Sequence, residues 1–170
     1  MGFPNSCYMR KVIVIGCPGA GKSTFSRKLA AKTSLPIHHL DLIWHRQDKS
    51  NIGREALILE LNKIMQGDEW IIDGNYLGTL PLRLQHCDTV IFLDYPVDVC
   101  IEGAMERLGK AREDMPWHET EMDPAFYQCI LDFPRTQLLV INDLLASCSN
   151  RLNIIRFKSR ADADAFIESL

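Results

Sequence analysis

Short hydrophobic runs alternate along this chain with segments in which hydrophobic positions recur every three or four residues. The short runs are rich in β-branched residues and predict buried strands at 11–15, 37–40, 69–73, 89–94 and 152–157. The periodic segments predict helices at 22–33, 54–65, 97–108, 124–147 and 161–170, with Pro134 dividing the 124–147 segment in two. Strands and helices that alternate in this way are typical of an α/β fold with a largely parallel sheet.

The composition is that of a compact domain. The chain has 170 residues, 46% of them hydrophobic and 24% charged, so we assign one domain to residues 9–170. Residues 1–8 are expected to form a flexible N-terminal extension. No hydrophobic run reaches the roughly 20 residues that span a bilayer. The six cysteines contain no C-x-x-C pair, which is typical of reduced thiols. We therefore expect a cytoplasmic protein without a membrane partner.

Charge is distributed unevenly along the chain. The formal net charge is −3, but residues 1–85 carry 11 Lys and Arg against 7 Asp and Glu, whereas residues 86–170 carry 8 against 15. A local basic site is compatible with this distribution, and a broad basic surface is not. The balance argues against direct binding of nucleic acid.

The most specific motif is a complete phosphate-binding loop, G-x-x-x-x-G-K-S, at 16–23. It lies between a predicted buried strand and a predicted helix, where backbone N–H groups and the helix N-terminus can cradle phosphates. Lys22 would reach the terminal phosphates and Ser23 would bind Mg²⁺. We expect nucleotide contacts from Gly16, Pro18, Gly19, Ala20, Gly21, Lys22, Ser23 and Thr24.

Carboxylates follow three of the predicted strands. Asp94 ends a hydrophobic strand, and in a phosphate-loop protein we expect such a residue near the metal and its waters. Asp73, followed by Asn75, and Asp41 end two others at the edge where open α/β sheets bind ligands. Asp41 is the better-placed base for an acceptor hydroxyl. A helix N-cap for Asp41 and a strand-end turn for Asp73 are the structural alternatives.

Basic residues concentrate in a polar segment after the helix at 97–108. Arg107, Lys110 and Arg112 lead into it, and an exposed, glycine-hinged segment with mobile cations is what a closing lid requires. We place this lid at about 108–124. The alternative is a solvated helix end whose cations favour the helix dipole. Arg83 is interpreted either as an acceptor contact or as a surface arginine. His38 and His39 point to opposite faces of a strand, so they do not form a metal pair.

The loop at 16–23, the strand end Ile72-Asp73-Gly74 and the arginine-containing lid together resemble the adenylate-kinase-like branch of P-loop kinases. The chain is similar from about residue 9 onward to bacterial DNA topology modulation proteins, through His39-Leu40-Asp41, 70–76, 88–94, 112–116 and 157–162. The resemblance implies a three-layer α/β/α P-loop fold with a five-stranded parallel sheet, helices on both faces and a short lid. It also implies ATP and Mg²⁺ as cofactors, with Ser159 close to the adenine.

The chain departs from nucleoside monophosphate kinases at one informative point. Adenylate kinase has Asp-Gly-Phe-Pro-Arg where this chain has Asp-Gly-Asn-Tyr-Leu, so the arginine that would hold an acceptor phosphate is missing at Leu77. The lid also has no cysteine quartet for zinc. The resemblance therefore does not extend to the acceptor.

These features predict an ATP- and Mg²⁺-dependent phosphotransferase that acts on a small-molecule acceptor. The catalytic residues would be Lys22, Asp41, Arg107 and Arg112, the acceptor would contact Asp41, Asp73, Asn75 and Arg83, and the metal would contact Ser23 and Asp94. The alternative is an ATP-binding regulatory protein that influences DNA topology and uses hydrolysis as a switch. Neither the acceptor nor the oligomeric state follows from the sequence.

Overall fold

The computed structural model describes residues 9–117 and 119–170. Within these residues five strands form one sheet, with β1 at Lys11–Gly16, β2 at Ile37–His39, β3 at Trp70–Asp73, β4 at Thr89–Leu93 and β5 at Asn153–Phe157. The strand order is β2-β3-β1-β4-β5, and every neighbouring pair is parallel. The expected parallel sheet is thereby confirmed. The predictions made for residues 1–8 lie outside the described residues.

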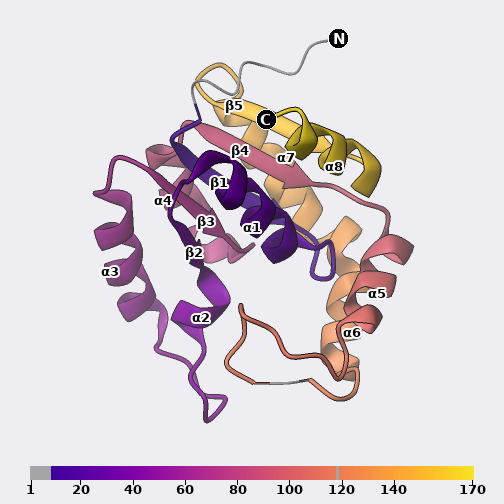
Figure 1. Ribbon diagram of the computed structural model, residues 1–170. Helices are drawn as coiled ribbons and strands as arrows, with labels where there is room; N and C mark the ends of the chain where they lie inside the picture. The colour runs from indigo at the N-terminus through magenta and orange to yellow at the C-terminus, as the bar shows by residue number, and fades with distance from the viewer. Residues whose placement is uncertain (1–8, 118) are drawn as a thin grey trace.

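Helices cover both faces of this sheet (Figure 1). Helices α1 and α8 lie on the face toward the viewer, and α4 and α7 lie behind the sheet. The helices are α1 Lys22–Thr33, α2 Leu40–Trp44, α3 Arg54–Met65, α4 Leu80–His86, α5 Val97–Glu106, α6 Pro124–Asp132, α7 Gln137–Cys148 and α8 Arg160–Glu168. Short 3₁₀ turns, η2 and η3, occupy Leu77–Thr79 and Phe133–Arg135. The three-layer α/β/α architecture is therefore confirmed.

The core follows from the composition of the central strands. Residues 12–15, 70–72 and 90–93 are almost completely buried because each of these strands has helices on both faces. The helices add one hydrophobic face each, as Leu57, Leu61 and Met65 do for α3. Because all five strands run parallel, their carboxyl ends meet at one edge, and the phosphate-binding loop leaves the sheet there.

Two elements differ from the sequence prediction. The strand expected to include Leu40 ends at His39, and Leu40 begins the short helix α2, which carries Asp41 in its first turn. Helix α4 was not predicted, because its seven residues are too few to show a clear helical period. The division of the 124–147 segment near Pro134 is confirmed by the 3₁₀ turn between α6 and α7.

None of the helices in the described parts of the chain has the length and hydrophobicity needed to cross a membrane.

Candidate active site

The phosphate-binding loop joins the end of β1 to the start of α1. Gly19 and Gly21 have φ angles of 83° and 86°, in the left-handed region that glycine adopts without strain. Within the loop, Nζ of Lys22 donates hydrogen bonds to the carbonyl oxygens of Gly16 and Cys17, each at 3.1 Å. The Lys22 ammonium therefore lies over the loop, at the opening where the α1 N-terminus adds positive potential.

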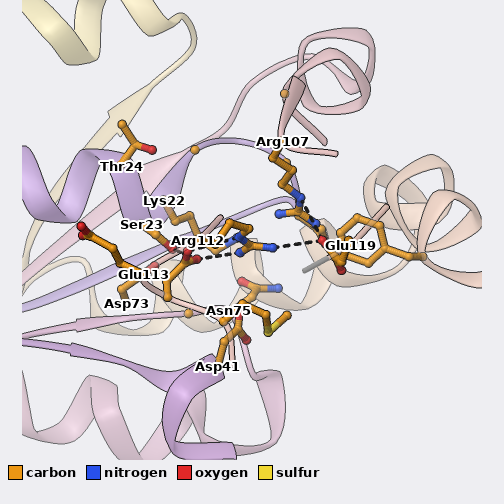
Figure 2. Close-up of a pocket in the computed structure, with 18 of the residues that line it drawn as sticks. Lys22, Ser23, Thr24, Asp41, Asp73, Asn75, Arg107, Arg112, Glu113 and Glu119 are labelled. Carbon is orange, nitrogen blue, oxygen red and sulfur yellow. Dashed lines mark hydrogen bonds and ion pairs between the residues drawn. The ribbon is translucent and has the colours of Figure 1, made fainter. Parts of the chain in front are cut away.

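A cavity of about 1040 Å³ opens from this loop. Its walls come from the loop and α1, from α2 and the end of β3, and from the segment between α5 and α6 (Figure 2). Lys22, Ser23 and Thr24 line it together with Asp41, Asp73 and Asn75. A second hollow of about 330 Å³ lies on the other side of Gly19, Gly21 and Thr24, and Arg160 and Ala163 of α8 border it. Residues predicted separately at the loop and at two strand ends thus share one space.

The strand-end residues are held by specific hydrogen bonds. Oδ1 of Asp41 accepts from the Tyr76 hydroxyl at 2.8 Å, and α2 has no side-chain cap, so Asp41 is not the helix N-cap. Oδ2 of Asp73 lies 2.7 Å from Nδ1 of His39, and its other oxygen, Oδ1, is buried without a hydrogen-bond partner among the described residues. Asn75 donates through its amide to Gln137, and its Oδ1 is likewise buried and unpartnered there. These oxygens are available to a ligand.

The segment predicted to be the lid lies over the loop. Asp114 accepts a hydrogen bond of 2.7 Å from the Ser23 hydroxyl and forms an ion pair of 2.6 Å with Arg112. Glu119 pairs with Arg112 at 3.1 Å and with Arg107 at 3.5 Å. Figure 2 shows Arg112 reaching between the Ser23 side and Glu119. Both predicted lid arginines therefore face the cavity, and each is engaged by an acidic residue of the same segment.

Burial and pairing shift the ionisation of this group. Burial opposes the charge on Asp114, but the hydrogen bonds from Arg112 and Ser23 outweigh it and hold the pKa of this carboxyl well below its ordinary value. Burial also lowers the pKa of the Arg107 guanidinium, and the positive charge of Arg112 adds to that effect. Asp114 is therefore a carboxylate at any ordinary pH.

Arg83 does not reach the acceptor side of the cavity, which corrects both of our expectations for it. Its side chain is completely buried and donates to the carbonyl oxygens of Gly74, Asn75 and Tyr76 at 2.8, 2.6 and 3.2 Å. Burial lowers the pKa of Arg83 to about 10. Arg83 is thus a positioning residue behind the strand-end turn, and it is neither a surface arginine nor a direct contact of the cavity.

Asp94 has basic partners that we did not expect. Its carboxylate is 8% exposed, binds Nε of Arg156 at 2.8 Å and pairs with Lys158. It lies outside the residues that line the cavity. Two cations, from β5 and the following turn, are its partners in this structure. The metal contact expected at Asp94 stays a prediction.

Ser159 caps helix α8 and is not among the residues that line either hollow. Its hydroxyl accepts from the backbone N–H of Asp162 at 3.1 Å and donates to the Asp162 carboxylate at 2.7 Å. The neighbouring Arg160 lines the smaller hollow instead. The segment predicted to approach the adenine is therefore near the loop, but the Ser159 side chain is used as an N-cap.

The cavity residues that sequence reasoning missed include Tyr76, Asp114, Glu119 and Gln137. Asp114 and Glu119 lie in a segment that we considered only for its cations, although the spacing Arg112-x-Asp114 allowed an internal ion pair. Gln137 begins α7, more than sixty residues from its partner Asn75, and no local signal connects the two. His39 contacts Asp73, and the prediction that His38 and His39 form no metal pair stays a prediction.

The oxygen donors around Ser23 suit magnesium. Mg²⁺ prefers oxygen ligands, keeps several waters and is commonly held by one or two protein groups together with substrate phosphates. Here the Ser23 hydroxyl and the unpartnered oxygen of Asp73 border the same cavity as the loop. The described residues contain no cluster of three or more His, Cys, Asp or Glu that could hold a metal by themselves. The residues therefore fit an ion that arrives with a nucleotide.

The sheet order and the loop define the class of fold as that of the P-loop kinases. Among solved structures, the chain is similar to shikimate kinase from Acinetobacter baumannii, with a TM-score of 0.64 and 15% identity over 95% of this chain and 90% of that one. It is similar to deoxyadenosine kinase from M. mycoides, with a TM-score of 0.54 and 13% identity over 93% and 95% of the two chains.

A sugar kinase from Janibacter sp. has a TM-score of 0.55 and 18% identity over 95% of this chain and 91% of that one. At these identities the likeness shows the fold alone. No protein-family model matches the chain, and the search of the curated proteins found no match.

Proposed function

We propose that this protein is an ATP- and Mg²⁺-dependent phosphotransferase that phosphorylates a hydroxyl group of a small molecule. The carrying observation is that one cavity joins Lys22 and Ser23 of the phosphate-binding loop to the carboxylates of Asp41 and Asp73, beneath two arginines. A phosphoryl donor and an acceptor can both be held in that space. The similar solved structures include kinases named for shikimate, deoxyadenosine and a sugar, which supports this class of reaction.

The donor side would bind ATP. The backbone N–H groups of the loop would hold its phosphates, and Lys22 would exchange its two carbonyl partners for phosphate oxygens. The smaller hollow beside Thr24 and Arg160 has room for the base. Mg²⁺ would be held by Ser23 and, through its waters, by Asp73, which would take the place that we expected for Asp94. The ion would neutralise part of the phosphate charge.

The acceptor side would supply the base. The acceptor hydroxyl would lose its proton to the Asp41 carboxylate while its oxygen bonds to the γ-phosphorus. The bond from that phosphorus to the bridging oxygen breaks, and its electron pair leaves with ADP. Arg107 and Arg112 would stabilise the charge that spreads over the transferring group. To do so they must turn from Glu119 and Asp114 toward the phosphate.

The finer resemblance to bacterial DNA topology modulation proteins is part of this proposal. Asp41 and Asn75, which are among the residues that carry it, border the cavity that opens from the phosphate-binding loop. We therefore propose that any effect of such a protein on DNA topology would follow from its small-molecule chemistry. We also propose that residues 9–170 form a single kinase domain, because the loop and the lid that border the cavity belong to the same chain.

The test is ATP turnover at fixed Mg²⁺ with a panel of acceptors, in the wild type, Lys22→Ala and the control Lys32→Ala. Lys32 is exposed on the same helix and far from the loop. An acceptor should stimulate ADP release, and Lys22→Ala should lower that rate by about 100-fold or more with an unchanged melting temperature. Slow turnover that no acceptor stimulates, but that Lys22→Ala abolishes, would favour the nucleotide-switch alternative.

A further inference from the structure

The acceptor side of the cavity has an amide whose orientation is fixed. Nδ2 of Asn75 donates to Oε1 of Gln137, and Nε2 of Gln137 donates in turn to Sγ of Cys129 at 3.5 Å. Asn75 is 9% exposed, borders the cavity and keeps its Oδ1 unpartnered among the described residues. This oxygen can only accept a hydrogen bond. A ligand that binds beside it must therefore bring a donor.

Asp41 presents the same kind of atom from the neighbouring element. Tyr76 donates to its Oδ1, and its Oδ2 has no hydrogen-bond partner in the described part of the chain. At Asn75 the unpartnered oxygen is buried, which costs free energy and is rare in native proteins, whereas Asp41 is half-buried. Two acceptor oxygens on one wall, from Asn75 and Asp41, match a molecule that offers two hydroxyl hydrogens (Figure 2).

The charges around this wall act against an acidic acceptor. Asp41 and Asp73 both border the cavity here, whereas the arginine nearest to the turn, Arg83, is buried behind it and donates to three backbone carbonyls. The lid guanidinium groups of Arg107 and Arg112 are matched by two lid carboxylates. Lys110 also lines the cavity, but it borders the smaller donor-side hollow as well, and Lys22 belongs to the phosphate-binding loop. A carboxylate or phosphate on the acceptor would therefore face Asp41 and Asp73 on a wall whose described residues supply no cation of their own.

We infer that the acceptor is a hydroxyl-rich compound without an acidic group, bound through adjacent hydroxyls that donate to Asn75 and Asp41. This inference rests on the proposed phosphotransfer and names its acceptor class. The hydroxyl that donates to Asp41 is the one that reacts and gives its proton to that carboxylate. The hydroxyl on Asn75 stays unchanged and fixes the orientation. Sugars and nucleosides have adjacent hydroxyls and no acidic group. Hydroxy acids and nucleotides also have hydroxyls, but they carry an anionic group that this wall would repel.

The experiment compares neutral acceptors with charged relatives that have the same ring skeleton. ADP release is measured with glucose against glucuronate and glucosamine, and with adenosine against its 5′-monophosphate, at fixed ATP and Mg²⁺. At least one neutral member should stimulate release about tenfold or more above its acidic counterpart. Stimulation by glucose or by adenosine identifies which source of hydroxyls the wall takes. An acidic member that equals or exceeds its neutral counterpart would overturn the inference and leave phosphotransfer standing.

A variant separates this inference from the proposed function. Asn75→Ala should raise the KM of the stimulating acceptor about tenfold, while the Kd for ATP stays unchanged. Asn62→Ala, on the exposed face of α3, is the matched control and should change neither constant. An unchanged acceptor KM in a folded Asn75→Ala protein would also overturn the inference.

Binding resolves the case in which no member stimulates release. If ligand-observed NMR detects no binding of glucose, glucosamine or adenosine, the inference fails. The proposed function is then judged separately by whether ATP turnover is lost in Lys22→Ala.

Discussion

At the scale of single residues, the sequence indicated which side chains could take part in a site, but it did not indicate which of them lie at the cavity. Asp73 and Asp94 both end buried strands beside β1 and look alike in the sequence. In the structure Asp73 borders the cavity, whereas Asp94 is neutralised by Arg156 and Lys158. Those partners lie about sixty residues away, so no local pattern announces them. The loop residues, in contrast, were predictable because eight consecutive positions specify their own conformation.

Arg83 offers a direct test of a residue whose role only the structure reveals. Arg83→Met keeps the apolar volume but leaves the carbonyl oxygens of Gly74, Asn75 and Tyr76 without their donor. The free energy of unfolding should fall by about 2–4 kcal/mol, as measured by urea denaturation. Tyr76 has a φ of 26°, which adds to the need for a brace at this turn.

The exposed Arg54 at the start of α3 provides the control for Arg83. Arg54→Met should change the stability by no more than about 0.5 kcal/mol. Equal effects of the two substitutions would mean that the buried guanidinium does not support the turn.

At the scale of elements, parallel pairing explains most of the predictive success. Alternating strand and helix patterns admit few topologies, and parallel strands deliver their carboxyl ends to one edge. The loop and the ends of β2 and β3 therefore converge without any further information. Helix α4 and the internal pairing of the lid escaped prediction, because seven residues show little period and ion pairs such as Arg112–Asp114 depend on the conformation of an irregular segment.

The contact between α5 and the loop can be tested at Gly103. A Cβ at this position would overlap the carbonyl oxygen of Gly19 and come within 2.6 Å of Nη2 of Arg160. Gly103→Ala gains up to about 1 kcal/mol of helix propensity but incurs about 1–3 kcal/mol from overpacking. We therefore expect a net loss of stability of up to about 2 kcal/mol and, because the loop must shift, a Kd for ATP that rises about tenfold.

The companion substitution Glu102→Ala lies on the exposed side of the same helix and should leave the Kd for ATP unchanged. Calorimetric titration of ATP measures both variants. If Gly103→Ala bound ATP as tightly as the wild type, the close approach of α5 would have no part in shaping the loop.

At the scale of the whole molecule, the lid ties together segments that are distant in the sequence. Asp114 holds Ser23 of α1, Glu113 lies 3.8 Å from Arg27, and the ring of Trp117 contacts that of His45 at 4.8 Å between centroids. The lid thus connects the phosphate-binding loop to the segment after β2 and covers the cavity that lies between them. Under the proposed function, ATP with its metal would compete with Asp114 for the Ser23 hydroxyl, which predicts that nucleotide binding and lid position are coupled.

This bridge gives the stability of the protein a defined dependence on pH. The contacts of Asp114 lower the pKa of its carboxyl below the ordinary value of 3.8. A carboxyl whose pKa is lower in the folded state stabilises that state fully above its unfolded pKa, and the contribution is lost as pH falls through the folded pKa. Asp114→Asn should therefore be less stable than the wild type by about 1–3 kcal/mol at pH 7.

That difference should persist down to about pH 5 and shrink only as the pH falls below the ordinary carboxyl pKa. Urea denaturation of both proteins at a series of pH values measures it, and subtracting one curve from the other removes the titration of all carboxyls that the two proteins share. Because Asn keeps the shape of the side chain and cannot ionise, a difference that stays constant to pH 3 would show that packing rather than charge holds the lid. A narrowing difference would show that the charge of Asp114, through its contacts with Ser23 and Arg112, holds the lid against the phosphate-binding loop.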